Sequence, residues 1–369
     1  MVYRAIGIMS GSSLDGLDLA FVELQETAGK WSYALKASSC YPYEDEWAEK
    51  LRKAPSLNAL DYQLLHTAYG HYTGEQVNRF INEHNLQYQA QLIASHGHTS
   101  FHIPGKKMTA QLGDGAAIAA VTGINVVSDL RAMDIALGGQ GAPIVPIGEK
   151  LLLGGYAYFL NIGGIANLSF NDPDQYIAYD VCPANRVLNM LARDAGKPFD
   201  EGGQIAEKGA VSGSLLEMLN ELAYYHLPHP KSLSNDFGTG VVYSLIRQER
   251  LSAPDALSSY VEHIAFQVAR SAAALQDEFG EDAAQENRKM LITGGGALNH
   301  FLVKRIGERL KPLNIDVVVP DNELIVFKEA IIMALIGVLR WREEDNTLAS
   351  VTGASRNSIG GAVWIGQES

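Results

Sequence analysis

The chain is poor in cysteine, in net positive charge and in long apolar runs. It has two cysteines, Cys40 and Cys182, among 369 residues, too few and too far apart for a disulfide framework or a zinc site. Its formal net charge of −13 argues against a nucleic-acid backbone or an anionic membrane as its main partner. We therefore expect a cytoplasmic protein that binds neither nucleic acid nor membrane.

Targeting and membrane-spanning patterns are also missing. The N-terminus enters a strand-like run over residues 2–9, without the charged and apolar regions of a signal peptide. The longest apolar helix pattern, residues 329–339, is shorter than the roughly 20 residues that cross a bilayer. It predicts a buried helix instead.

What the chain does have is alternation of strand and helix patterns in both halves, which predicts an α/β fold. Its length suits two domains of roughly 100–200 residues each. Strand patterns lie near 3–9, 17–24, 33–39, 91–95, 124–128, 156–161, 165–170, 176–179 and 289–293. Helical patterns lie near 44–53, 57–84, 113–122, 183–195, 202–209, 211–224 and 256–279. The glycine-rich segment 138–143 predicts a crossing between two lobes.

Three glycine- and hydroxyl-rich turns, each preceded by an apolar run, stand out. They span residues 9–16, 161–167 and 293–299. Glycine lets backbone N–H groups approach an anion, and hydroxyl or amide side chains add donors. Three such turns predict a nucleotide in a cleft between two lobes. No lysine of a Walker loop follows any of them, which disfavours a P-loop fold.

Ten segments together closely resemble the anhydro-N-acetylmuramic acid kinase family, in the family's order and over nearly the whole chain. They are residues 7–18, 95–99, 111–115, 129–131, 138–143, 161–167, 180–185, 293–296, 328–330 and 352–354. The resemblance implies a two-lobed fold of the actin-like and sugar-kinase ATPase superfamily, with a nucleotide cleft between two similar domains. The lobes expected are 1–137 plus 350–369, and 138–349.

The resemblance also implies an activity. The family opens 1,6-anhydro-N-acetylmuramic acid with water and phosphorylates it to N-acetylmuramic acid 6-phosphate during peptidoglycan recycling. ATP and Mg²⁺ are the expected cofactors, and a homodimer is the expected assembly. Because the superfamily hosts many activities, the site residues must carry this one.

Residue roles follow from the same resemblance. Asp180 is the expected base and Arg131 the expected cation at the sugar. The residues expected to bind the nucleotide are Ser10, Gly11, Ser12, Ser13, Asp15, Asn161, Gly163, Gly164, Asn167, Gly294, Gly295 and Gly296. Those expected to bind the sugar are Ser95, His98, Thr99, Arg131 and Glu329, and Asp15 or Asp18 is expected to hold Mg²⁺.

Each role has a structural alternative. Asp180 could cap the helix that starts near Pro183, and Arg131 could pair with Asp129 or Asp134 on a solvated turn. Glu329 could be a first-turn glutamate that the helix dipole stabilises. The three glycine turns could be ordinary hairpin or strand-to-helix turns. His96, His98 and His102 lie close enough to suggest a metal, but no carboxylate or thiol pattern completes such a site.

The chain also departs from the family's pattern. Ser12 stands where a threonine is usual, and His98 where a glutamine is common. Cys182 and Ala184 replace the glycines that flank the proline of the catalytic turn, and their Cβ atoms would resist a left-handed backbone or crowd a ligand. Two rival functions therefore stay open: a nucleotide-binding regulator without the chemistry, and a kinase or phosphatase of another small substrate on the same fold.

Overall fold

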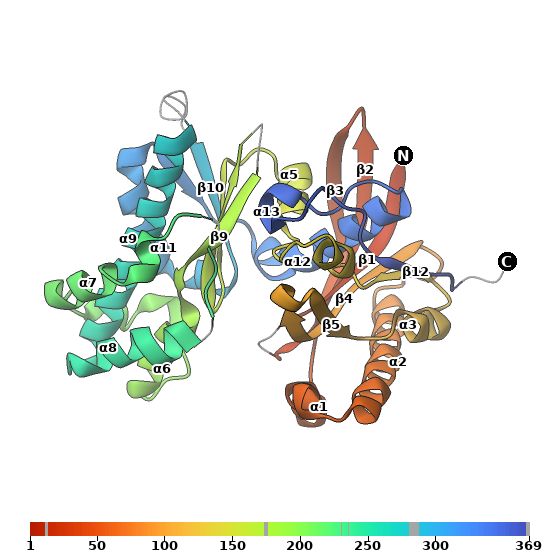
Figure 1. Cartoon of the computed structure of the whole chain (residues 1–369), viewed down its shortest axis with the longest axis horizontal. Helices are drawn as coiled ribbons and strands as arrows, with labels where there is room; N and C mark the ends of the chain where they lie inside the picture. The colour runs from red at the N-terminus through yellow and green to blue at the C-terminus, as the bar shows by residue number, and fades with distance from the viewer. Residues whose placement is uncertain (12–13, 173–175, 230, 235, 280–287, 367–369) are drawn as a thin grey trace. The chain divides into compact units, whose positions relative to one another are not determined.

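The computed structural model describes residues 1–11, 14–172, 176–229, 231–234, 236–279 and 288–366 (Figure 1). The chain divides into two compact units: Met1–Leu153 with Phe327–Ser369, and Gly154–Val326. The crossings between the units therefore follow residues 153 and 326, whereas the sequence placed them after residues 137 and 349. The segment 138–143 and most of the helix before residue 342 belong to the first unit.

The first unit is built on a mixed sheet. Its described strands run in the order β12-β6-β4-β1-β2-β3, with β5 paired to β4. β1, β4 and β6 are parallel, and β1, β2 and β3 form an antiparallel meander. The strands are β1 (Val2–Ser10), β2 (Gly16–Thr27), β3 (Lys30–Pro42), β4 (Leu92–Ile103), β5 (Met108–Leu112), β6 (Asn125–Ser128) and β12 (Ala362–Trp364).

The helix α12 (Asn322–Trp341) packs closely against the sheet of this unit. A Cβ on Gly7 of β1 would overlap the backbone oxygen of Ala330, and a Cβ on Gly337 would lie 2.5 Å from the Cβ of Ala94 on β4. The buried ion pair between Lys328 Nζ and a Glu149 carboxylate oxygen, 2.8 Å apart, joins α12 to α5. The helices are α1 (Asp45–Lys53), α2 (Ala59–Glu83), α3 (Gly115–Thr122), α4 (Ala132–Ala136), α5 (Pro146–Leu152), α12 (Asn322–Trp341) and α13 (Ala349–Thr352).

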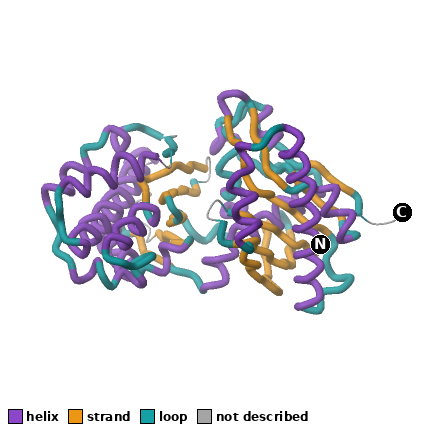
Figure 2. Tube along the Cα trace, turned by 90° about the horizontal axis from the view of Figure 1, so that it is seen from below, coloured by secondary structure: helices purple, strands orange, loops and turns teal. Residues whose placement is uncertain are grey.

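The second unit has its own mixed sheet, with described strands in the order β11-β10-β7-β8-β9. β11, β10 and β7 are parallel, and β7, β8 and β9 are antiparallel. Its helices gather on one side of the strands (Figure 2). The strands are β7 (Tyr158–Ile162), β8 (Ile165–Asn171), β9 (Tyr176–Pro183), β10 (Arg288–Thr293) and β11 (Ile315–Val318). The helices are α6 (Asn185–Asp194), α7 (Gly213–Asn220), α8 (Tyr243–Gln248), α9 (Ala253–Phe279) and α11 (His300–Leu310).

The α/β class expected from the sequence is confirmed, and most expected elements are present. The predicted helix over 202–209 is wrong: two 3₁₀ turns, Glu201–Gly203 and Ala206–Lys208, replace it. Gly202 and Gly203 have φ of 63° and 79°, and a right-handed helix cannot continue through that backbone. The tail, whose partner the sequence left open, pairs as β12 antiparallel to β6. No helix in the described part of the chain is long and apolar enough to cross a membrane.

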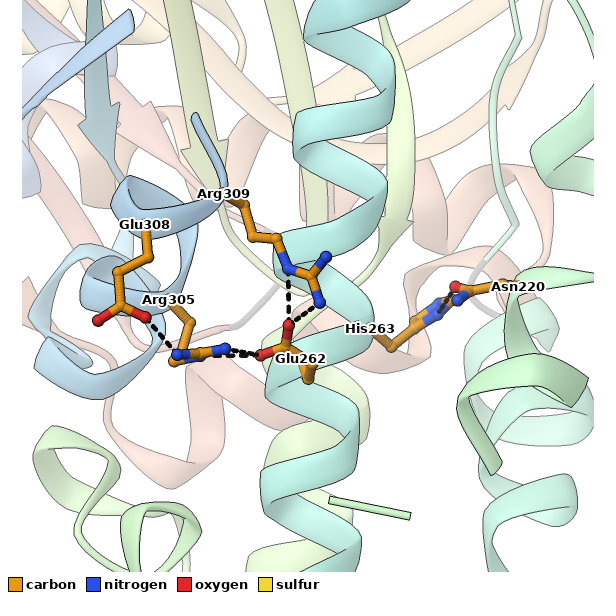
Figure 3. A network of polar contacts seen from close by, with 6 residues as sticks. All are labelled: Asn220, Glu262, His263, Arg305, Glu308 and Arg309. Carbon is orange, nitrogen blue, oxygen red and sulfur yellow. Dashed lines mark hydrogen bonds and ion pairs between the residues drawn. The ribbon is translucent and has the colours of Figure 1, made fainter. Parts of the chain in front are cut away.

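A charged cluster joins α9 to α11 in the second unit (Figure 3). The side chain of Glu262 is 5% exposed and accepts hydrogen bonds from both Arg305 and Arg309. Burial opposes the charged form of Glu262, but the two arginines outweigh it and hold the pKa of this carboxyl below its ordinary value. The cluster therefore stabilises the packing of α11 on α9 when Glu262 is ionised.

Glu262→Gln should lower the free energy of unfolding by about 2–3 kcal/mol near neutral pH, because it leaves two half-exposed arginines without their shared carboxylate. The depressed pKa means that this contribution is present above the unfolded pKa and is lost as pH falls through the folded one. Urea unfolding of both proteins at several pH values measures the difference. Glu308→Gln, which removes only an exposed partner of Arg305, is the control and should change stability little.

Candidate active site

The first glycine turn lies in the hairpin between β1 and β2. Met9 pairs with Asp18, Ser10 pairs with Leu17, and Leu14 N–H donates to Gly11 O at 3.3 Å. The turn is thus a hairpin, as the structural alternative held, and that geometry is compatible with a phosphate loop. Ser12 and Ser13 lie outside the described residues.

Ser10 belongs to a chain of buried hydroxyl groups that the sequence did not reveal. Its Oγ lies 2.9 Å from His98 Nδ1 and 2.7 Å from the Tyr43 hydroxyl, which lies 2.5 Å from the Tyr69 hydroxyl. Burial lowers the pKa of His98 to about 4, so the ring is neutral near pH 7, with one donor and one acceptor nitrogen. Tyr43 and Tyr69 lie far from Ser10 in sequence. The pairing of β2 with β3 places Tyr43, directly after β3, beside the first turn, the pairing of β1 with β4 brings His98 to Ser10, and the packing of α2 brings Tyr69.

Arg131 is held by a neutral histidine and not by a carboxylate. Its Nε donates to His96 Nε2 at 2.8 Å, and its Nη1 donates to Gly141 O at 2.5 Å. Because His96 Nε2 accepts, its Nδ1–H donates to Gly97 O at 2.8 Å. Burial and the charge of Arg131 lower the pKa of His96 to about 3. The side chain of His96 therefore orients the guanidinium without adding charge.

The solvated ion pair proposed as an alternative for Arg131 is wrong. Asp134 is 1% exposed and accepts from Gly141 N–H at 2.7 Å and from Thr352 Oγ1 at 2.6 Å. Burial lowers the pKa of Arg131 to about 10, against the charges of Glu329 and Asp134. Arg131 is thus charged at neutral pH and close enough to Glu329 to feel its charge.

The Asp18 carboxyl lies near two other carboxylates of the first unit, Glu329 and Asp15. Burial raises the pKa of Asp18, a hydrogen bond with Cys40 opposes this, and the charges of Glu329 and Asp15 raise it further. α12 starts at Asn322, so Glu329 lies in its third turn and the first-turn alternative is wrong.

Two other residues expected to bind the sugar, Ser95 and Thr99, differ in solvent exposure. Ser95 is buried on β4, whereas Thr99 is exposed and its hydroxyl accepts a hydrogen bond from Gln111 Nε2 at 3.4 Å.

The histidine cluster does not have the form of a metal site. Both ring nitrogens of His96 are engaged, and the Nδ1 atoms of His98 and His102 bond to Ser10 and Thr109. Among the described residues there is no group of three or more histidine, cysteine or acidic side chains placed to hold a metal ion. The three rings instead serve hydrogen bonds within the first unit.

In the second unit, Asp180 on β9 is held by donors on both carboxylate oxygens. Asn167 Nδ2 of β8 donates to Oδ1, and Leu233 N–H donates to Oδ2 at 2.8 Å. The Tyr224 hydroxyl donates to the backbone oxygen of Asp180 at 2.6 Å. Burial raises the pKa of Asp180, while the hydrogen bonds from Leu233 and Asn167 oppose the rise.

The capping alternative for Asp180 is wrong. The residue before α6 is Ala184, which makes no side-chain cap. Cys182 and Ala184 are fully buried, and neither has a positive φ, Ala184 lying at −131°. The left-handed backbone that a glycine would serve is therefore not used at these two positions. Leu233 and Tyr224 are contributors that no sequence pattern singled out.

The second and third glycine turns meet in this unit. Asn161 on β7 pairs with Asn167 on β8 and with Thr293 at the end of β10. Gly294 has φ of 78°, and a Cβ there would lie 2.6 Å from Asn161 Oδ1. A Cβ on Gly296 would overlap the side chain of Ile162. Glycine is thus required where the third turn crosses the second, and α11 then starts from its Asn299 cap.

The structure therefore gathers the expected residues into two groups. The first unit brings together Ser10, His98, Arg131, Asp18 and Glu329, with Gly11 and Asp15 in the hairpin turn beside them. The second unit brings together Asn161, Gly163, Gly164, Asn167, Asp180 and Gly294 to Gly296.

Comparison with solved structures finds a distant likeness. This chain is similar to the activator of the 2-hydroxyisocaproyl-CoA dehydratase from Clostridium difficile with bound ADPNP. The TM-score is 0.45 at 15% identity, covering 92% of this chain and 96% of that one, too distant a likeness to bear on the chemistry.

Curated relatives are much closer. The chain is 33% identical to the anhydro-N-acetylmuramic acid kinase of Sulfurovum sp. (98% of this chain and 99% of that protein). It is 32% identical to those of Coxiella burnetii (99% and 98%) and Vibrio parahaemolyticus (97% of each). A family model described as anhydro-N-acetylmuramic acid kinase matches residues 3–366. The chain therefore belongs to the anhydro-N-acetylmuramic acid kinase family.

Proposed function

We propose that the protein is an ATP-dependent kinase that opens 1,6-anhydro-N-acetylmuramic acid with water and phosphorylates it, giving N-acetylmuramic acid 6-phosphate for peptidoglycan recycling. The observation that supports this most directly is Asp180. Its carboxylate is partly buried, is oriented by Asn167 and Leu233, and caps no helix. A carboxylate fixed in this way, with its pKa raised by burial, suits a general base.

In the proposed reaction, Asp180 takes a proton from the water that attacks the anomeric carbon. The bond from that carbon to the bridging oxygen breaks, and this oxygen, on carbon 6, takes the γ-phosphoryl group of ATP, leaving ADP. Phosphoryl transfer depends mainly on positioning and charge neutralisation. Arg131 supplies a charged, pre-oriented fork for the sugar or for the transferred group.

Further assignments follow from the same proposal. Ser10, Gly11, Ser12, Ser13 and Asp15 of the first turn, and Asn161, Gly163, Gly164 and Asn167 of the second, contact the phosphates. Gly294 to Gly296 lie on the adenosine side. Ser95, His98, Thr99, Arg131 and Glu329 contact the sugar.

Asp18, with Asp15 beside it, would hold the magnesium ion, because burial and the charges of Glu329 and Asp15 raise the pKa of the Asp18 carboxyl and a divalent cation would relieve this. A bound Mg²⁺ would neutralise charge on the nucleotide's phosphates. The two cysteines are free, which supports a reduced, cytoplasmic location. The family resemblance supports a homodimer.

A coupled assay for ADP release tests the function. Release that depends on the anhydro sugar, and is absent with ordinary N-acetylmuramic acid, would show that ring opening accompanies phosphorylation. ATP binding without sugar-dependent ADP release would contradict the proposal and favour a nucleotide-binding regulator.

Asp180→Asn should lower kcat by about 10²–10⁴-fold, because the amide cannot accept the proton of the attacking water. Binding of ATP, measured by calorimetry, should stay close to that of the unmodified protein. Asp194→Asn, on an exposed carboxylate paired with Arg247, is the matched control. Turnover that survives in Asp180→Asn would remove Asp180 from the role of base.

The pH profile should move when Asn167 is changed. The base must be ionised, so kcat/KM falls as pH drops below the pKa of Asp180. Asn167→Leu removes a donor to the charged carboxylate, which raises this pKa and shifts the acid limb of the profile to higher pH. Asn171→Leu, on the same strand but opposite Tyr176, should leave the limb in place. An unshifted limb in Asn167→Leu would mean that another group controls it.

A further inference from the structure

Arg186, the second residue of α6, carries a guanidinium with one unfilled donor. Its Nε is buried and has no hydrogen-bond partner. Within the described residues, no carboxylate forms an ion pair with it. Arginine stays charged in proteins, and a buried charged donor without a partner is costly. A ligand that accepts from this nitrogen would remove the cost.

The guanidinium lies over the turn between β7 and β8. A Cβ built on Gly164 would be 3.6 Å from Arg186 Nε and 3.9 Å from its Nη2. The Gly164 carbonyl accepts from Ala184 N–H at 2.8 Å and from Arg186 N–H at 3.4 Å. The start of α6 is thereby fixed on this turn, and the arginine is fixed beside it.

Neither Gly163 nor Gly164 is required by the protein's own packing. A Cβ on Gly163 would meet only Ile165 O, at 3.6 Å, and the three atoms nearest to one on Gly164 would all belong to Arg186, at ordinary contact distances. Neither residue has a positive φ. Gly294 and Gly296, by contrast, face close backbone or side-chain neighbours. Because Gly163 and Gly164 have no side chains, space stays open beside the guanidinium of Arg186.

A second unfilled donor lies on the adjoining strand. Thr293 is 1% exposed, and its hydroxyl has no hydrogen-bond partner. It pairs with Asn161 across β10 and β7, directly before the third turn. A Cβ on Gly295 of that turn would lie 3.7 Å from Asn185 Nδ2, next to Arg186 in sequence. Arg186 lies beside the second turn and Thr293 directly before the third, and these two turns meet at Asn161 and Gly294. Guanidinium, hydroxyl and glycine-turn N–H groups are those that hold a phosphate.

We infer that Arg186 binds a phosphate group of the nucleotide beside Gly163 and Gly164, with Thr293 completing the same subsite. The inference rests on the proposed function for the identity of the anion. Arg186 is then a nucleotide-binding residue, distinct in place and partner from Arg131 of the first unit.

Calorimetry with ADP, a non-hydrolysable ATP analogue and adenosine tests the assignment in Arg186→Gln. Loss of one charge-assisted contact should weaken binding of the two phosphorylated ligands about 10-fold to 100-fold, while adenosine binding stays unchanged. Arg186→Lys keeps the charge without the planar fork and should give an intermediate loss. Arg193→Gln, on the exposed last turn of the same helix, is the matched control and should bind all three ligands normally.

Unchanged affinity for ADP and the analogue, or an equal loss for adenosine, would overturn the assignment. So would a rise in KM for the anhydro sugar alone, which would place the arginine on the sugar's carboxylate. The melting temperatures of both Arg186 variants show whether a loss of stability causes the loss of nucleotide affinity. If Arg186→Gln does not fold, the affinity of Arg186→Lys for ADP tests the assignment. Turnover by the unmodified protein tests the proposed function separately, so the two ideas can fail independently.

Discussion

A carboxylate that has lost part of its water stays ionised only if protein donors replace that water, and the partly buried Asp180 meets this constraint. A side-chain amide serves one oxygen and a backbone amide the other. Both donors are neutral, so they orient the group and favour its ionised form without the strong pKa depression that a cation would cause. Arg131 is likewise oriented by neutral partners, the imidazole of His96 and the backbone carbonyl of Gly141. In both units a charged side chain is thus oriented by neutral partners that leave its charge uncompensated.

The glycines of the chain serve several physical purposes. Gly7 and Gly337 let α12 approach the first sheet, and Gly294 and Gly296 let the third turn cross the second. Gly163 and Gly164 serve neither packing nor a left-handed backbone. In one sequence, the same residue type thus marks internal crowding in one place and room for an outside molecule in another.

Much of the fold was readable from the sequence because hydrophobic periodicity reports burial directly. The meander of β1, β2 and β3, the parallel β4 and the long helices α2 and α9 all carry that signal. β5, β11 and β12 are short and depend on partners elsewhere in the chain, so no local pattern predicted them. In the candidate site, chemically marked residues such as Asp180 and Arg131 could be named from the sequence, and their roles stay predictions. Their partners Leu233 and His96 were missed because a backbone N–H has no sequence signature and a histidine's role depends on what faces it.

The ion pair between Lys328 and Glu149 sets the rotation of α12 as well as its position. Successive residues of an α-helix are turned by about 100°, so one residue of slippage would swing Glu329 away from Arg131. The Lys328 bond fixes the helix on one side, and the contact of Ala330 with Gly7 fixes it on the other. Glu329 lies between these two anchors in sequence. The contacts of Lys328 and Ala330 thus determine the side of α12 from which the Glu329 side chain projects, although Glu329 itself caps no helix.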